Sequence, residues 1–350
     1  MNTISLENFK KEVNQIREYL RHIEYVNAVA SCVVVETDNE QIKTSINQLK
    51  EHLRSFGRDK QIFEYKAAII SLYGLLEKYV ELWIKEYLDS LASVVPEYNQ
   101  IDEKIRNNHF ELSLKLINTI MSRQSAKYQH LTKEKILHKL NSCIVSPKNY
   151  QINAEAFVLS SGNLKHKKIS DLFNLLNINL NDKLMKNESL KREIGLQNPE
   201  NKDILYNKIN ELVERRNEIA HGSETSDNIL SVSELEPYIQ FLDVYCQAIF
   251  EILSEEFIKQ ESKYTFQKIE TVIEIFYDKT LYFEIENYTI KVGDMIIIET
   301  TKGIFSKKPI LDIQLDSVSY PELEISEKTN VEVWVEPKIK KNQTFYIARK

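Results

Sequence analysis

The hydrophobic period of the chain changes once, near residue 265, and this change constrains the fold more than any other feature. Before it, apolar residues recur three or four positions apart, as on one face of an α-helix. After it, short runs alternate β-branched and aromatic residues with polar ones, and Gly, Pro, Asp and Asn separate the runs. The sequence therefore predicts a multidomain α + β protein, mainly a helical bundle followed by a small, barrel-like all-β module.

An N-terminal helical hairpin is expected over residues 1–57. Residues 6–27 and 42–53 each carry an amphipathic helical period, with a short break between them. Gly57 is a plausible helix end. The apolar stripe of this hairpin must be covered by the next part of the chain or by a partner.

A helical domain is expected over residues 58–262 and the β module over 263–350. Residues 61–94 form the strongest helix, with a broad apolar face. A later helix ends in the segment ERRNEIAHG, where Gly222 suits the position just beyond a helix C-terminus.

Composition narrows the functional class. The formal charge of −6 over 350 residues argues against a protein that coats nucleic acid, although a local basic patch remains compatible with it. The three cysteines are widely spaced and lack metal-ligand neighbours, which predicts reduced thiols, no metal site and no cofactor in a cytoplasmic protein. No apolar h-region and no apolar run of roughly 18 residues appears, so no signal peptide and no membrane contact is expected.

The segment 214–222 holds the residues best suited to chemistry. Arg216 and His221 are five positions apart, about 7.5 Å along a helix axis and about 140° around it. Arg216 is long and His221 lies where the helix ends, so both heads can reach one phosphate. Asn217 shares the face of His221 and is placed either to orient the imidazole or to steady the chain turn.

These residue types suit cleavage of RNA. The 2′-hydroxyl is an internal nucleophile, so the catalyst only moves protons and stabilises charge on phosphorus. Histidine transfers protons near neutral pH, and arginine forks onto two phosphate oxygens. One histidine is few for two proton transfers, and two copies meeting along this helix would supply an acid and a base. The alternative reading is a plain helix end, with His221 beside the helix dipole and Gly222 as the stop.

The string VERRNEIAHG resembles the signature of HEPN domains, an arginine followed by four to six residues and a histidine near a helix end. It is most similar to the RiboL-PSP-HEPN group, in which RN-x-I-A-H-G is characteristic. Residues 67–89 resemble the first long helix of that group, and residues 163–178 resemble its lead into the motif helix. The likeness covers about residues 61–260.

This resemblance implies a helical bundle that dimerises through the motif helices. It implies a metal-independent endoribonuclease that leaves 2′,3′-cyclic phosphate ends and acts as a toxin or in antiviral defence such as abortive infection, with an antitoxin or sensor as a possible partner. Arg216 and His221 carry over as catalytic residues, Asn217 as their polar neighbour and Glu77 as a carboxylate that pairs with one of them. Glu77 is alternatively a solvated helix carboxylate. The alternative function is a non-catalytic HEPN module that binds RNA, a nucleotide or a protein.

Two further features bear on RNA. Lys165, Lys167 and Lys168 form a basic run that either is a solvated face or receives the RNA backbone, if the helix at 166–178 lies beside the motif helix. In the β module, IKVGDMIIIETTKG faintly resembles the second-domain barrel of translation factors. Trp334 alternates within a strand there, either as core or as a platform for base stacking.

Overall fold

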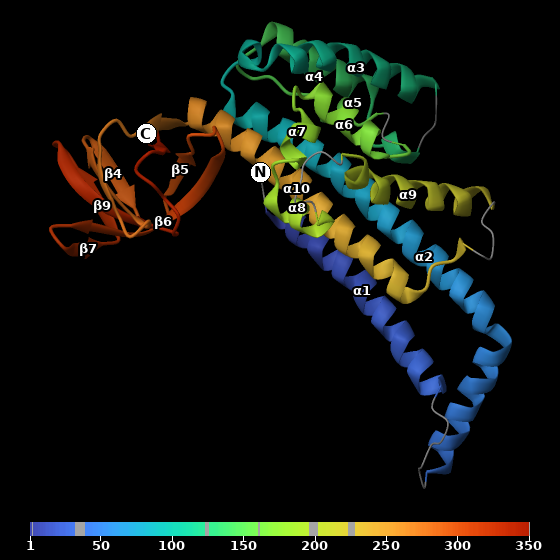
Figure 1. Ribbon diagram of the computed structural model, residues 1–350. Helices are drawn as coiled ribbons and strands as arrows, with labels where there is room; N and C mark the ends of the chain where they lie inside the picture. Colours follow the sequence, from blue (N-terminus) through green and yellow to red (C-terminus); the bar gives the residue numbers. More distant parts are fainter. Residues whose placement is uncertain are drawn as a thin grey trace. The chain divides into compact units, whose positions relative to one another are not determined.

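The computed structural model describes residues 1, 3–31, 39–122, 126–159, 162–195, 202–222 and 228–349. Figure 1 traces the helices and strands along the chain. The α-helices are α1 (Ile4–Ser31), α2 (Glu40–Val94), α3 (Glu103–Ser122), α4 (Lys133–Val145), α5 (Ala154–Phe157), α6 (His166–Leu175), α7 (Leu180–Leu184), α8 (Glu188–Ile194), α9 (Lys202–His221) and α10 (Val232–Tyr264). Short 3-10 turns, η1 (Tyr98–Gln100) and η2 (Ala126–Tyr128), flank α3.

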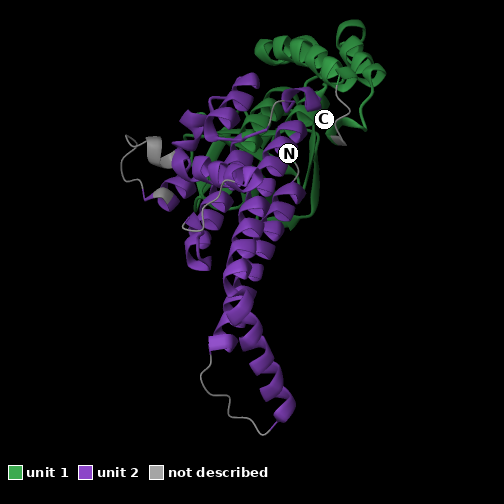
Figure 2. Ribbon diagram, turned by 90° about the vertical axis from the view of Figure 1, so that its right-hand side faces the viewer, with its two compact units in different colours: residues 1, 87–153, 253–350 green, residues 2–86, 154–252 purple. Residues whose placement is uncertain are grey.

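The chain forms two compact units, coloured separately in Figure 2. Unit 1 contains residues 1, 87–153 and 253–350, and unit 2 contains residues 2–86 and 154–252. The long helices α2 and α10 contribute residues to both. The expected division at residues 57 and 262 remains a prediction.

Unit 2 is held by aromatic side chains of α1, α2 and α10. Trp83 is fully buried, with ring centroids 5.5 Å from Phe9 and 5.4 Å from Phe250 in edge-on contacts. Its indole N–H donates to Ser5 Oγ at 3.1 Å. On the rim, Arg17 of α1 donates to Asp243 of α10 at 3.0 Å. The apolar face predicted for residues 61–94 is thus the core of this unit.

The helix end expected at Gly57 is wrong, because α2 continues through that residue from Glu40 to Val94. A glycine inside a helix costs about 1 kcal/mol relative to alanine, and residues on both sides of Gly57 keep the helical period. Lys60, one turn further on, donates to Asn27 of α1 at 3.1 Å. The hairpin of α1 and α2 exists as predicted, but its second helix runs on without a break.

The helical part of unit 1 contains a buried histidine. His109 of α3 is fully buried, and its Nε2 accepts the backbone N–H of Asn153 at 2.9 Å. Its Nδ1 therefore carries the proton and donates to the Tyr98 hydroxyl at 2.9 Å. Burial, with a smaller effect of Lys139, lowers the pKa of His109 to about 4.

The β module of unit 1 is an antiparallel half-barrel. Its strands are β1 (Phe266–Lys268), β2 (Val272–Phe276), β3 (Thr280–Ile285), β4 (Tyr288–Lys291), β5 (Met295–Glu299), β6 (Phe305–Leu315), β7 (Val318–Tyr320), β8 (Glu322–Ile325), β9 (Thr329–Val335) and β10 (Thr344–Ala348). The main sheet has the order β1-β10-β5-β6-β9-β3-β2, with β7 beside β6, and β4 pairs with β8 separately. The six alternating runs of the sequence correspond to β3, β4, β5, β6, β9 and β10, as predicted.

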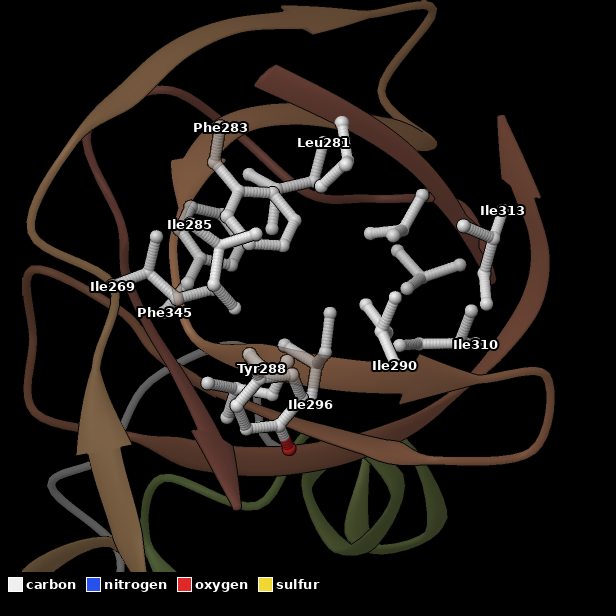
Figure 3. Packing of buried hydrophobic residues seen from close by; sticks show 14 of the residues in the cluster. Ile269, Leu281, Phe283, Ile285, Tyr288, Ile290, Ile296, Ile310, Ile313 and Phe345 are labelled. Atoms are coloured by element: carbon white, nitrogen blue, oxygen red, sulfur yellow. The ribbon is translucent and has the colours of Figure 1, made fainter. Parts of the chain in front are cut away.

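The half-barrel closes around its own apolar core, shown in Figure 3. Leu281 and Phe283 of β3 and Phe345 of β10 are fully buried within it. A register shift at Ile310–Asp312 lets β6 pair with β5 through its first half and with β9 through its second half. The fold is therefore α + β with a separate β module, as the change of hydrophobic period predicts.

Within the described ranges, no helix is long and apolar enough to cross a membrane. Cys143 and Cys246 are buried free thiols, as predicted, and Cys32 lies outside the described residues.

Candidate active site

The motif residues lie at the C-terminal end of α9. Ile209, Leu212 and Val213 are buried and fix the helix to unit 2. Gly222 follows the last helical residue with a φ of +64°, and its N–H donates to the Ile219 carbonyl at 3.3 Å. This left-handed conformation is the helix stop predicted for Gly222. The buried stripe ends before Ile219, which is only half-buried, so the last turn of the helix projects from the core.

Arg216 is held against an aromatic ring of α2. Its guanidinium carbon lies 4.3 Å from the centroid of Tyr73, a cation–π distance. Its Nη1 also donates to Asn217 Oδ1 at 3.0 Å. Both contacts leave other N–H groups of the guanidinium available, because arginine has five. The arrangement keeps a permanent positive charge at a defined position and in reach of an anion.

Tyr73 also fixes the loop that precedes α6. Its hydroxyl accepts the backbone N–H of Asn163 at 3.0 Å and that of Leu164 at 3.4 Å. Asn163 has a φ of +62°, a conformation that asparagine tolerates better than most residues. One buried tyrosine therefore positions the Arg216 head on its ring and the loop at its hydroxyl.

His166, the first residue of α6, joins that loop to α9 and α10. Its backbone N–H donates to Asn210 Oδ1 at 3.0 Å, and its ring stacks on Tyr206 with centroids 3.5 Å apart. Nε2 donates to Asn181 Oδ1 at 2.7 Å, so Nδ1 accepts the hydroxyl proton of Tyr245 at 2.8 Å. Burial lowers the pKa of His166 to about 4, despite the opposing effect of Asn181. This histidine is neutral and structural.

The neighbouring Arg215 points to different partners. Its Nη1 donates to the Tyr65 hydroxyl at 3.1 Å and to the carbonyl of Asn228 at 2.9 Å. Burial opposes the charge of Arg215, but the hydrogen bonds to Tyr65 and Tyr238 outweigh it and raise its pKa. Arg215 therefore ties α9 to α2 and to the start of α10, and the two adjacent arginines have separate surroundings.

His221 is exposed at the end of α9. No hydrogen bond or ion pair between described residues engages its imidazole, so the ring is accessible to a ligand. It does not contact Arg216, as expected for residues about 140° apart on one helix. The hydrogen bond expected between Asn217 and His221 is not present among the described residues, and the Asn217 amide oxygen accepts from Arg216.

Glu77 and the three lysines lie around this site. Glu77 is half-buried, one helical turn beyond Tyr73, and its pairing with Arg216 or His221 remains a prediction. Lys165 forms an ion pair with Glu214 of α9, Lys167 is exposed and Lys168 is half-buried. Helix α6 lies beside the motif helix, which was the condition for these lysines to face RNA.

Sequence reasoning missed the residues that position the motif. Tyr73 and Tyr65 are far from Arg216 and Arg215 along the chain, so no local spacing links them. One signal was available for Tyr73, which stands four residues before Glu77 and therefore shares its helix face. In the part of the chain that the structure describes, no three His, Cys, Asp or Glu residues gather as metal ligands.

The comparison with known proteins assigns a family to this chain. The sequence profile described as RiboL-PSP-HEPN matches residues 37–255, which include Tyr73, the Asn163 loop and the whole of α9. No curated protein matches the chain. The match extends over more than half of the 350 residues, and the chain belongs to the RiboL-PSP-HEPN family.

Proposed function

We propose that this protein is a metal-independent endoribonuclease whose chemistry rests on Arg216 and His221. The observation that carries the proposal is the contrast between the two side chains at one helix end. Tyr73 and Asn217 hold the Arg216 guanidinium, whereas the His221 imidazole is exposed. A fixed cation and an accessible acid–base group at the same helix end are what transfer at a phosphodiester requires.

In the proposed reaction the 2′-oxygen of RNA attacks the adjacent phosphorus. A base removes the 2′-hydroxyl proton as the P–O2′ bond forms. The P–O5′ bond breaks, and an acid protonates the departing 5′-oxygen. The products are a 2′,3′-cyclic phosphate and a 5′-hydroxyl. Arg216 stabilises the charge on the non-bridging oxygens, and His221 transfers a proton.

A second copy of the chain would complete the acid–base pair. On α2, Phe63, Ala67, Ile70 and Gly74 follow a four-three spacing, the period of helices that pack on one another. Phe63 and Ile70 are 67% and 52% exposed. Beside them, Ala67, Ser71 and Gly74 form one wall of a groove of about 670 Å³ along α1. Exposed apolar side chains next to a groove on the same helix favour packing against an identical, antiparallel surface.

One antiparallel register of two α2 helices brings the exposed apolar side chains of each copy onto the small residues of the other. It places Phe63 on Gly74 of the second copy and Ile70 on its Ala67. The two Tyr73 residues would then be about 13 Å apart along the helices, at 1.5 Å per residue. Both Arg216 heads would lie on the same side of the paired helices, so one RNA strand could contact both sites. The homodimer therefore includes α2 as well as the motif helix.

Cleavage of RNA in the presence of EDTA tests the chemistry. The parent protein should release fragments with cyclic phosphate ends, and His221→Ala and Arg216→Ala should lower the rate by about 10²-fold or more. Matched controls are His22→Ala and Arg54→Ala, which alter exposed residues elsewhere. Growth arrest on expression, relieved by Arg216→Ala, would support the role as a toxin or defence effector. If both motif variants cleaved RNA as fast as the parent, the catalytic proposal would be refuted, and the alternative of a non-catalytic HEPN binding module would remain.

The oligomeric state in solution tests the proposed homodimer. The parent should have twice the 41.1 kDa mass of one chain, and Phe63→Glu with Ile70→Glu should produce monomers with little cleavage activity. Phe110→Glu, which changes a 48% exposed apolar residue of α3, should remain dimeric. A double Phe63/Ile70 variant that stays dimeric would refute this interface.

The lysines at the start of α6, Lys165, Lys167 and Lys168, are proposed to contact the RNA backbone. Lys165 is partly neutralised by Glu214, so Lys167 and Lys168 carry most of this contact. Replacing both by alanine should weaken RNA binding for all sequences and reduce the salt dependence of log Kd by about two units of slope. Unchanged salt dependence would remove these residues from the binding surface.

A further inference from the structure

The outer face of the half-barrel carries aromatic and acidic side chains in an ordered arrangement. Leu281 and Phe283 of β3 point into the core, as Figure 3 shows, so Tyr282 between them faces outward. By the same alternation Glu332 and Trp334 of β9 face outward, between buried valines. On β2, Glu274 is in register with Tyr282, and Phe276 is in register with Thr280, which stands opposite Trp334. Tyr282, Glu332, Trp334, Glu274 and Phe276 form the outer patch.

Strand register places one tyrosine of the outer patch between two carboxylates. Tyr282 stands opposite Glu274 on β2 and opposite Glu332 on β9. Neighbouring strands are about 4.8 Å apart, so both carboxylates border the tyrosine ring. A guanidinium laid on that ring would contact an aromatic face and a carboxylate together.

In the next row of the outer patch, Phe276 and Trp334 lie on either side of the buried Thr280, and Trp334 already holds a cation. Phe276 lies two residues after Glu274, with its ring centroid 6.3 Å from that of Tyr282. The ammonium of Lys279 lies 4.6 Å from the centroid of Trp334. The chain thus places one of its own cations on this aromatic surface.

The carboxylates beside Tyr282 are available to a ligand. Among the described residues no hydrogen bond or ion pair engages the side-chain carboxylate of Glu274 or of Glu332. Other acidic side chains of the half-barrel do have partners: Asp312 accepts from Gln314 at 2.9 Å, and Glu284 accepts from Lys328 at 3.3 Å. Free negative charge around Tyr282 repels phosphates, which disfavours the base-stacking role considered for Trp334.

Strand β2 also offers its backbone. It stands at the end of the strand order, and no described strand pairs with its outer edge. Its sequence VIEIF is strongly β-prone and exposes its polar backbone groups along that edge. An extended peptide can add to such an edge by main-chain hydrogen bonds, and its alternate side chains then continue the rows of the sheet.

We propose that the outer patch and the edge of β2 bind an extended, basic segment of a protein partner. An arginine or lysine of that segment would lie beside Glu274 and reach the Tyr282 ring. Two positions away, an apolar or aromatic side chain would lie beside Phe276. The opposite face of the peptide would be apolar, because it continues the row of Val272 and Ile275, which pack against the core of the half-barrel.

Fluorescence anisotropy of labelled probes tests this proposal on the full chain carrying His221→Ala, which prevents cleavage of RNA. The probes are a nine-residue peptide in which arginine alternates with valine, the same peptide with glutamate for arginine, and a nine-nucleotide oligouridylate. The arginine peptide should bind at least about tenfold more tightly than the other two. It should also slow amide hydrogen exchange in residues 272–276.

Variants separate this surface from general attraction to an acidic protein. Glu274→Lys should weaken binding of the arginine peptide about tenfold, and Tyr282→Leu should weaken it about fivefold through loss of the cation–π contact. Glu324→Lys on β8 makes the same change in net charge at an exposed strand position outside the patch, and should have little effect. Equal weakening by Glu274→Lys and Glu324→Lys would overturn the proposal. So would tight oligouridylate binding that Trp334→Ala removes, because the surface would then serve RNA.

Discussion

His166 should make the helical unit around the motif sensitive to acid. Its imidazole accepts from Tyr245 and donates to Asn181, and burial lowers its pKa from 6.5 to about 4. In the unfolded chain histidine takes up a proton below about pH 6.5. The folded protein does not, until the pH approaches 4. Acidification therefore favours the unfolded state, and the stability that this residue contributes at neutral pH falls as the pH is lowered through that window.

The size of the effect follows from the two pKa values. One pKa unit corresponds to about 1.4 kcal/mol. The part of the free energy of unfolding that depends on His166 should therefore fall by about 2 kcal/mol between pH 8 and pH 5, and by about 3 kcal/mol by pH 4. Because His166 joins the Asn163 loop to α9, the same loss would loosen the surroundings of Arg216.

Urea unfolding followed by Trp83 fluorescence measures this loss. Trp83 is buried within the same unit as His166, and a Trp334→Phe background leaves it as the only tryptophan. His166→Gln lowers stability at pH 8 but should reduce the loss of unfolding free energy between pH 8 and pH 5 by about 2 kcal/mol, leaving any part that the buried His109 contributes. His221→Gln, an exposed residue, should leave that loss unchanged. If His166→Gln retains the full loss between pH 8 and pH 5, the assignment of the acid sensitivity to His166 is refuted.

Three further changes probe other contacts. Tyr73→Phe keeps the ring under Arg216 but removes the acceptor for the Asn163 and Leu164 amides, so thermal unfolding should show a loss of stability of about 1–3 kcal/mol. Tyr73→Leu also removes the cation–π contact with Arg216, so it should reduce RNA cleavage more than Tyr73→Phe does. Gly222→Ala places a Cβ at a φ of +64°, so calorimetry should show a loss of about 1–2 kcal/mol; an unchanged melting temperature would contradict the left-handed helix stop. Phe345→Ala removes a fully buried side chain of the half-barrel and should destabilise the β module by about 3–5 kcal/mol, read from Trp334 fluorescence.

Local patterns predicted the parts of this protein that depend on neighbouring residues. The change of hydrophobic period near residue 265 separated helices from strands, and Gly222 was recognised because the helical stripe stops beside it. Gly57 is also a glycine in a helical segment, yet the apolar helical period continues after it and α2 runs through it without a break. The three-residue strands β1 and β7 are too short to display alternation.

The surroundings of the motif could not be predicted in this way. The contact of Arg216 with Tyr73 joins residues of two helices far apart in sequence. Asn217 lies on the same helix face as His221, but its side chain accepts a hydrogen bond from Arg216. Sequence spacing alone does not decide between these two nearby partners. Similarly, nothing local to Arg215 indicates that it binds Tyr65 whereas Arg216 lies on a ring.

The course of β6 has a consequence for how the half-barrel opens. Its first residues pair with β5 and its later residues pair with β9, so a single strand belongs to both halves of the sheet. Neither half can lose β6 without breaking the ladder of the other. Thermal fluctuations should therefore open the module as one cooperative body, with no intermediate in which only one half has melted.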